Sequence, residues 1–187
     1  MSKWFHIAAV LSLCAAGTSA TAAPDAKYPL LEQLTVPKKD LPDSCETQEI
    51  PPDALPVKGL KNCSVTNDPK AFVIGDEPLK DLIDPKDVEA MYLALYREKG
   101  DCGLFGWAFK TEDDALKAYE RLAAHYGNQF QRIRLWQAKN YVVWLWRDPG
   151  TSDECFHRLK NFVQAKVDDF KEQRAEPQPH SPKVQSK

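Results

Sequence analysis

The segment from Arg132 to Arg147 constrains the fold most, because its composition and spacing predict two strands joined by a short turn. Most of its residues are β-branched, aromatic or aliphatic, and such side chains suit a pleated, half-buried surface. The first half alternates polar and apolar residues, which is typical of a strand with one wet face. The second half, from Tyr141 to Trp146, is apolar throughout, which favours a strand covered on both faces. We therefore predict a β-hairpin here.

The length of the turn decides which side chains share a face, since a slip of one residue moves every side chain to the opposite face. A two-residue turn at Lys139-Asn140 places Leu135 opposite Trp144 and Ile133 opposite Trp146, with both tryptophans in the core. A three-residue turn that also includes Ala138 makes a core face of Ile133, Leu135, Val143 and Leu145, and puts Arg132, Arg134, Trp136, Trp144 and Trp146 on the other side. The Asn-Gly pair that marks a tight hairpin turn is absent, so both registers stay open.

Arginines beside tryptophans on one side of a sheet indicate a binding surface for a sugar, an aromatic molecule or a protein. Cation–π contacts of about 0.5–2 kcal/mol each would hold such a surface together. Large aromatic residues also dominate protein cores, so a purely structural role competes with this interpretation. The candidate ligand-binding residues are Trp107, Arg132, Arg134, Trp136, Trp144 and Trp146.

Residues 1–23 have the pattern of a secretory signal peptide, with Lys3 before a short apolar run and small residues at the expected cleavage sites. The apolar run is too short to span a bilayer. Lipid attachment at Cys14 is less favoured, because Leu13 is not the small residue that normally precedes a lipidated cysteine. We therefore expect an exported protein, periplasmic or secreted, with no transmembrane span.

Four cysteines follow the predicted leader, and an even count in an exported chain predicts disulfide bonds. Of the three pairings, we favour Cys45–Cys63 and Cys102–Cys155. The first would close a loop in a segment without regular structure and add about 3 kcal/mol. No Cys/His pattern predicts a metal site, and no motif implies a cofactor.

Residues 24–70 hold eight of the chain's 14 prolines, which disfavour both strand pairing and helix interiors. We expect a proline-rich arm that carries one disulfide, irregular but ordered from about Leu41 and loose before it. Residues 171–187 lack aromatic side chains and predict a disordered tail. The folded domain is then expected to span residues 71–170.

Within residues 71–170, the pattern predicts strand, helix, strand, helix, hairpin and helix. The expected elements are a strand at 71–74, a helix from Asp84 to Gly100, a strand at 102–110, a helix from Thr111 to Gly127 and a helix after Gly150. This order favours an α+β two-layer sandwich, with an antiparallel or mixed sheet of about four strands and three helices on one face. A ferredoxin-like arrangement is one candidate.

Catalytic groups are sparse in this sequence. Cys155 and His157 at a predicted helix start form a candidate thiol nucleophile and base. They are two residues apart, so they do not face each other on a helix, and a disulfide is the simpler role for Cys155. Without residues 1–23 the chain keeps 24 basic and 27 acidic residues, which argues against nucleic-acid binding.

The function expected from the sequence is therefore a non-catalytic exported domain that binds a protein, glycan or small ligand on its aromatic and arginine surface. A thiol-dependent enzyme that uses Cys155 and His157 is the first alternative. A structural or inhibitory module is the second, and pairing of two copies through an open sheet face is a related expectation.

Overall fold

The computed structural model of this chain describes residues 26–48, 61–72, 79–129 and 131–173. The predicted leader at 1–23 and all but the first three residues of the predicted tail lie outside these ranges. The strands are β1 (Glu46–Thr47), β2 (Ser64–Thr66), β3 (Val88–Arg97), β4 (Asp101–Phe109), β5 (Ile133–Ala138) and β6 (Tyr141–Arg147). The α-helices are α1 (Pro29–Glu32), α2 (Leu79–Leu82), α3 (Glu112–Tyr126) and α4 (Asp153–Gln173). Short 3-10 helices cover Lys38–Asp40, Pro69–Ala71 and Pro85–Asp87.

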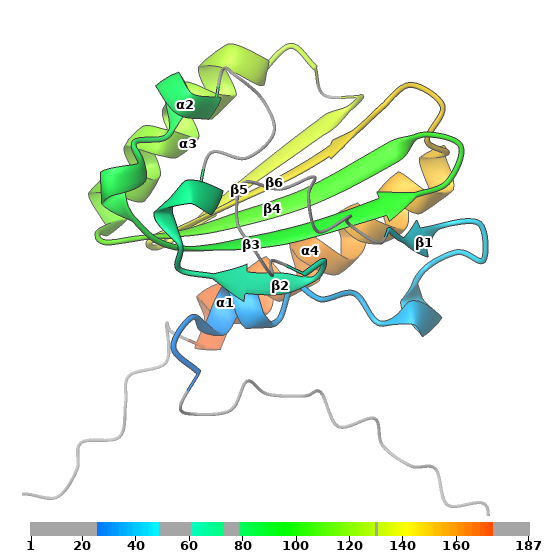
Figure 1. The fold of residues 1–187 in the computed structure, drawn as a ribbon, viewed down its shortest axis with the longest axis horizontal. Coiled ribbons are helices and arrows are strands. Elements are labelled where there is room, and N and C mark those ends of the chain that lie inside the picture. Colours follow the sequence, from blue (N-terminus) through cyan, green and yellow to red (C-terminus); the bar gives the residue numbers. More distant parts are fainter. Residues whose placement is uncertain (1–25, 49–60, 73–78, 130, 174–187) are drawn as a thin grey trace, which may run out of the picture.

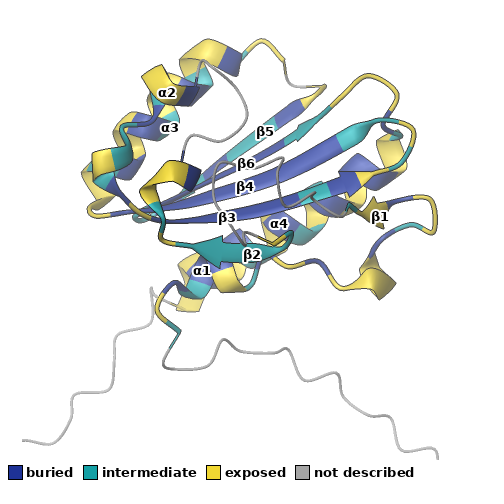
Figure 2. Ribbon diagram, viewed as in Figure 1, coloured by how far each residue is buried: buried dark blue, intermediate teal, exposed yellow. Residues whose placement is uncertain are grey.

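The six strands form one antiparallel sheet in the order β1-β3-β4-β6-β5, and β2 also pairs with β3. Figure 1 shows α2 and α3 on one side of this sheet and α1 and α4 on the other. Two separate clusters of buried side chains fill the two sides. The central strands are therefore buried on both faces, as Figure 2 shows.

This architecture corrects the predicted fold class. The chain is α+β, but the sheet has six strands and four α-helices accompany it, two of them long, rather than four strands and three helices on one face. From β3 onward the order is strand, strand, helix, strand, strand, helix, which is not the ferredoxin-like order.

The largest difference concerns β3, because the sequence predicted a helix over the same residues. Asp84 does act as a cap, but its carboxylate accepts a hydrogen bond from the Lys86 N–H in a 3-10 turn, and the strand begins at Val88. Tyr92 and Tyr96 then face α4, whereas Met91 lies in the cluster under α3. A strand that is buried on both faces loses the alternation that would identify it.

The two long helices follow the prediction closely. Thr111 caps α3, since its hydroxyl accepts a hydrogen bond from the Asp114 N–H at 3.1 Å. Gly127 lies at the C-terminal end of that helix. The hydroxyl of Ser152 accepts a hydrogen bond from the Cys155 N–H at 3.1 Å and caps α4 in the same way. Such caps satisfy amide groups that have no partner within the helix.

The segment before Leu41 was expected to be loose, but it belongs to the core. Leu30, Leu31 and Leu34 are 0% exposed and pack in the cluster between the sheet and α4. They approach β4 closely at Gly106, where a Cβ atom would lie 2.8 Å from Leu31 and 2.9 Å from Leu34. The predicted strand at 71–74 is also wrong, because Ala71 ends a 3-10 helix and residues 73–74 lie outside the described ranges.

Cys45 and Cys155 form the disulfide, so the predicted pairing of Cys45 with Cys63 and of Cys102 with Cys155 is wrong. The bond connects the start of β1 to the first turn of α4, and Cys63 and Cys102 are free. Cys102 is buried on β4, and its thiol donates a hydrogen bond to the Trp146 carbonyl at 2.9 Å. A disulfide fits an oxidising compartment. No helix within the described part of the chain is long and apolar enough to cross a membrane.

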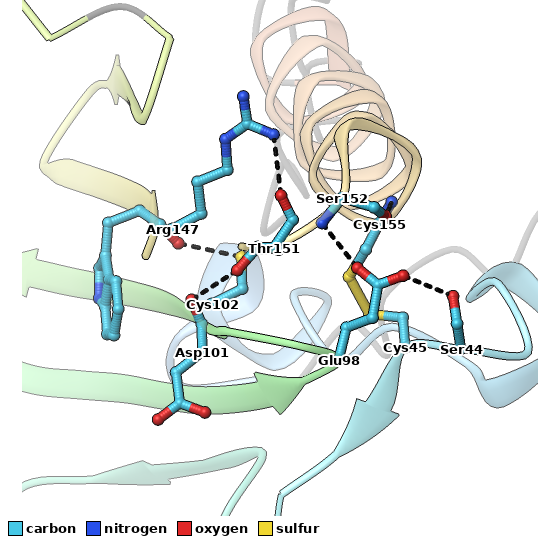
Figure 3. Close-up of a disulfide and its surroundings, with 10 residues drawn as sticks. Ser44, Cys45, Glu98, Asp101, Cys102, Arg147, Thr151, Ser152 and Cys155 are labelled. Carbon is cyan, nitrogen blue, oxygen red and sulfur yellow. Dashed lines mark hydrogen bonds between the residues drawn. A yellow bond between two sulfur atoms is a disulfide. The ribbon is translucent and has the colours of Figure 1, made fainter. Parts of the chain in front are cut away.

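Figure 3 shows a carboxylate that reinforces the same junction. Glu98, just after β3, accepts hydrogen bonds from the Ser44 hydroxyl at 2.8 Å and from the Ser152 N–H at 2.6 Å. These contacts lower the pKa of the Glu98 carboxyl below its ordinary value. Ser44, next to Cys45, and Ser152, three residues before Cys155, are thus linked through Glu98 as well as through the sulfur bond.

Candidate functional site

The hairpin has the two-residue turn, with Leu135 opposite Trp144 and Ile133 opposite Trp146. Lys139 adopts a positive φ of 51° at this turn. The backbone N–H of Phe109 donates to the Asn140 carbonyl at 2.8 Å, and the Asn140 side-chain amide donates to the Phe109 carbonyl, also at 2.8 Å. The end of β4 therefore holds the turn in place without the glycine that such turns usually need.

This register divides the predicted surface between the two faces of the sheet. Trp144 and Trp146 lie on the α3 face with Ile133 and Leu135. Trp136 lies on the α4 face, 8% exposed, and its indole N–H donates to the Gln164 side-chain oxygen at 2.7 Å. Arg134 also lies on that side, with its guanidinium 5.8 Å from the centre of the Phe156 ring.

Trp107 belongs to the interior of the α3 face. Its side chain is 0% exposed, and its indole N–H donates to the Phe72 carbonyl at 2.9 Å. The ring is nearly parallel to that of Trp144, with 6.3 Å between the centroids. Trp107 can therefore support Trp144 from behind but offers no surface of its own.

The arginines of the hairpin also separate. The guanidinium of Arg147 pairs with the Asp153 carboxylate at 2.6 Å and lies 4.7 Å from the centre of the Phe156 ring. Arg147 therefore contacts the first turn of α4. Arg132 precedes β5 and is exposed, and its Nε donates to the Arg147 carbonyl at 3.4 Å. The expected open face of arginines over tryptophans does not form.

The structure instead brings Arg132, Trp144 and Trp146 together around a cavity of about 340 Å³. This cavity lies on the α3 face, beyond the C-terminal end of α3, where β5 begins and β6 ends. Largely apolar walls are common in sites for small molecules, and this volume falls at the lower end of such sites. The residues that line it are Phe105, Tyr126, Gln129, Arg132, Ile133, Trp144, Trp146, Arg147 and Asp148.

Aromatic contacts order the walls of this cavity. The Tyr126 ring lies nearly parallel to that of Trp144, with 5.2 Å between centroids, and it comes from the last turn of α3. The Phe105 ring meets Trp144 edge to face at 5.7 Å and Trp146 at 6.4 Å. Such pairs contribute about 0.5–1.5 kcal/mol each beyond the burial of their area. The walls are consequently set by packing and do not depend on a ligand.

One polar atom in this wall lacks a partner. The indole nitrogen of Trp144 is buried and makes no hydrogen bond within the described part of the chain. A buried donor without a partner costs about 1–3 kcal/mol. Trp146, in contrast, is half-buried, so it is the tryptophan of this group that a ligand can reach directly.

The groups proposed for thiol chemistry do not converge. The Cys155 sulfur is bonded to Cys45, and His157 is exposed on α4. Burial raises the pKa of the free Cys102 thiol to about 12, which disfavours the reactive thiolate. Among residues 26–48, 61–72, 79–129 and 131–173, no group of three His, Cys, Asp or Glu side chains could hold a metal ion.

Sequence reasoning missed the part of the cavity that comes from outside the hairpin. Tyr126 and Phe105 fall within the helix and the strand predicted at Thr111 to Gly127 and at 102–110, but neither residue was assigned to a site. Gln129 and Asp148 lie in the turns that flank the hairpin, where nothing in the sequence sets them apart from ordinary loop residues. No family model, curated protein or solved structure matches this chain.

Proposed function

We propose that this protein is an exported, non-catalytic binding domain whose ligand occupies the aromatic cavity at the start of β5. The observation that carries the proposal is the half-buried indole of Trp146 in a preformed, largely apolar cavity of about 340 Å³. Sites for small molecules are typically concave, apolar and largely preformed. The volume favours a small molecule, or one side chain of a larger partner, over an extended glycan.

Export to the periplasm or the cell exterior belongs to the same proposal. Its supports are the leader-like pattern of residues 1–23 and the Cys45–Cys155 disulfide, which fits an oxidising compartment. The proposal assigns the ligand to Arg132, Trp144 and Trp146 among the residues predicted from sequence. It assigns Trp107, Arg134 and Trp136 to packing.

A fragment screen by NMR spectroscopy tests the proposed site. The protein, labelled with ¹⁵N, is titrated with mixtures of small soluble fragments while the indole N–H resonances are followed. Trp→Phe variants assign the resonances. We expect bound fragments to shift the Trp146 resonance and to leave that of Trp136 unchanged, because Trp136 lies on the opposite face. Fragments that shift Trp136 but never Trp146 would reject the cavity as the binding site.

A further inference from the structure

We infer that the cavity selects a planar aromatic ring, which stacks on the exposed face of the Trp146 indole. This inference rests on the proposed function and adds the chemical class of the ligand. It depends on how the indole is held, on which of its faces is covered, and on the remaining walls of the cavity.

The indole of Trp146 lies flat across the backbone of Gly103, its partner on β4. Three adjacent ring atoms, Nε1, Cε2 and Cζ2, are all closer to a Cβ placed on Gly103 than any real side chain permits. Because these three atoms are almost equally near, the ring lies across the direction in which that side chain would point. An aromatic ring over a cross-strand glycine is a recognised way to cover such a gap.

The covered face of the indole therefore points at the sheet, and the opposite face points away from it. Trp146 is half-buried and lines the cavity, so we assign its accessible surface to this opposite face. Phe105 meets Trp146 edge to face, with 62° between the planes, and fixes the ring from the side. The result is a rigid, flat platform, which suits offset stacking with a second flat ring.

The other walls favour an aromatic ligand over a sugar. Phe105, Tyr126 and Trp144 also line the cavity, and any hydroxyl of a sugar that faced these rings would lose its hydrogen bonds to water without gaining a partner. Charge does not choose the ligand, because the lining includes both arginines and Asp148, and the Arg147 guanidinium is already paired with Asp153. Flatness is the property that this site can recognise.

Three probes test the inference by titration of ¹⁵N-labelled protein: naphthalene-2-carboxamide, its saturated counterpart decahydronaphthalene-2-carboxamide, and methyl β-glucopyranoside. We expect the flat amide to bind about tenfold more tightly than the saturated one, the energy of one good stacking contact. It should also move the Trp146 resonance upfield through its ring current.

The other outcomes separate the two proposals. Equal affinity of the two amides, with the Trp146 resonance shifted, would overturn planar selection and leave the binding cavity standing. Binding of the glucoside but of neither amide would likewise overturn planar selection and leave the binding cavity standing. If no probe shifts Trp146, the inference is overturned, and failure of the fragment screen as well would remove the proposed function.

Matched glycine variants test the role of the platform. Gly103→Ala must displace the indole and should weaken the flat amide about tenfold towards the affinity of the saturated one. Gly106→Ala, on the same strand but facing Leu31 and Leu34, should leave both affinities unchanged. Circular dichroism establishes that each variant folds. If Gly103→Ala does not fold, Trp146→Leu replaces it as the test. The inference is overturned if the Trp146→Leu variant still prefers the flat amide to the saturated one.

Discussion

Replacement of both Cys45 and Cys155 by alanine should lower the free energy of unfolding by about 3–5 kcal/mol. The two cysteines are 110 residues apart in the sequence, so the disulfide closes most of the folded chain into one loop. A chain-entropy treatment assigns about 4.7 kcal/mol to a loop of roughly 100 residues. Residual structure in the unfolded chain reduces this value, which sets the lower end of the range.

The structure indicates that the variant still folds. Glu98 bonds to Ser44 and Ser152 on both sides of the junction, and Leu30, Leu31 and Leu34 are fully buried, so these contacts hold the same side of the fold in addition to the sulfur bond. The loss of stability should therefore come chiefly from the greater conformational freedom of the unfolded chain. A domain of this kind is typically stable by about 5–15 kcal/mol, so a loss of this size leaves a folded but marginal protein.

Guanidinium denaturation followed by tryptophan fluorescence measures the effect. The midpoint should fall and the denaturant slope should rise, because an unlinked chain exposes more surface when it unfolds. Once its disulfide has been reduced, the natural protein should have the same unfolding midpoint and slope as the variant. A loss below about 1 kcal/mol would refute the reasoning. So would peptide mapping of the unreduced protein that joins Cys45 to Cys63.

Three further changes test local features. Glu98→Gln should lower the unfolding midpoint at pH 7. The folded-state contacts lower the pKa of this carboxyl from its ordinary value of 4.5, so the benefit is complete above pH 4.5 and is lost as the pH falls through the folded-state pKa. A difference between the two proteins that does not shrink as the pH is lowered below 4.5 would contradict the assignment. Thr111→Ala should cost about 1 kcal/mol in chemical denaturation, whereas Thr111→Ser keeps the cap and should cost much less. Trp136→Phe removes the hydrogen bond to Gln164 and should cost about 1 kcal/mol without changing the affinity of the cavity for naphthalene-2-carboxamide; a loss of that affinity would contradict its place on the α4 face.

The elements that the sequence predicted well carry their own local signals. Thr111 and Gly127 mark the two ends of α3, and Ser152 marks the start of α4. Strand β4 and the hairpin were predicted from β-branched and aromatic composition. In each case neighbouring residues along the chain supply the physical reason for the structure, so no knowledge of the rest of the fold was needed.

Strand β3 was beyond local reasoning, because its residues are good helix formers and its apolar positions also fit a helical stripe. What makes it a strand is pairing with β1, β2 and β4 and burial on both sides. Strand preference depends strongly on such surroundings. Because β3 was predicted as a helix, the expected sheet lacked one of its central strands. The expected number of strands and the expected placement of the helices on one face were wrong for this reason.

The candidate site was predicted in part for a similar reason. Arg132, Trp144 and Trp146 were recognised from composition, but the face that each occupies depends on the turn at Lys139 and Asn140. That turn is fixed by Phe109, which lies 31 residues before Asn140 and is invisible to local patterns. The disulfide follows the same logic, since Cys45 meets Cys155 only after α4 has packed on the sheet.

Side chains of α1 and α4 pack in one buried cluster on the same side of the sheet, which has a consequence for biosynthesis. The leucines of α1 find their final neighbours only when residues near 156–170 are present, because α4 completes that side of the core. The ribosome must therefore have made α4 before this side can close. Until α4 has been made, Leu30 and Leu31 lack part of the side chains that bury them in the folded protein, and chaperones can reach them.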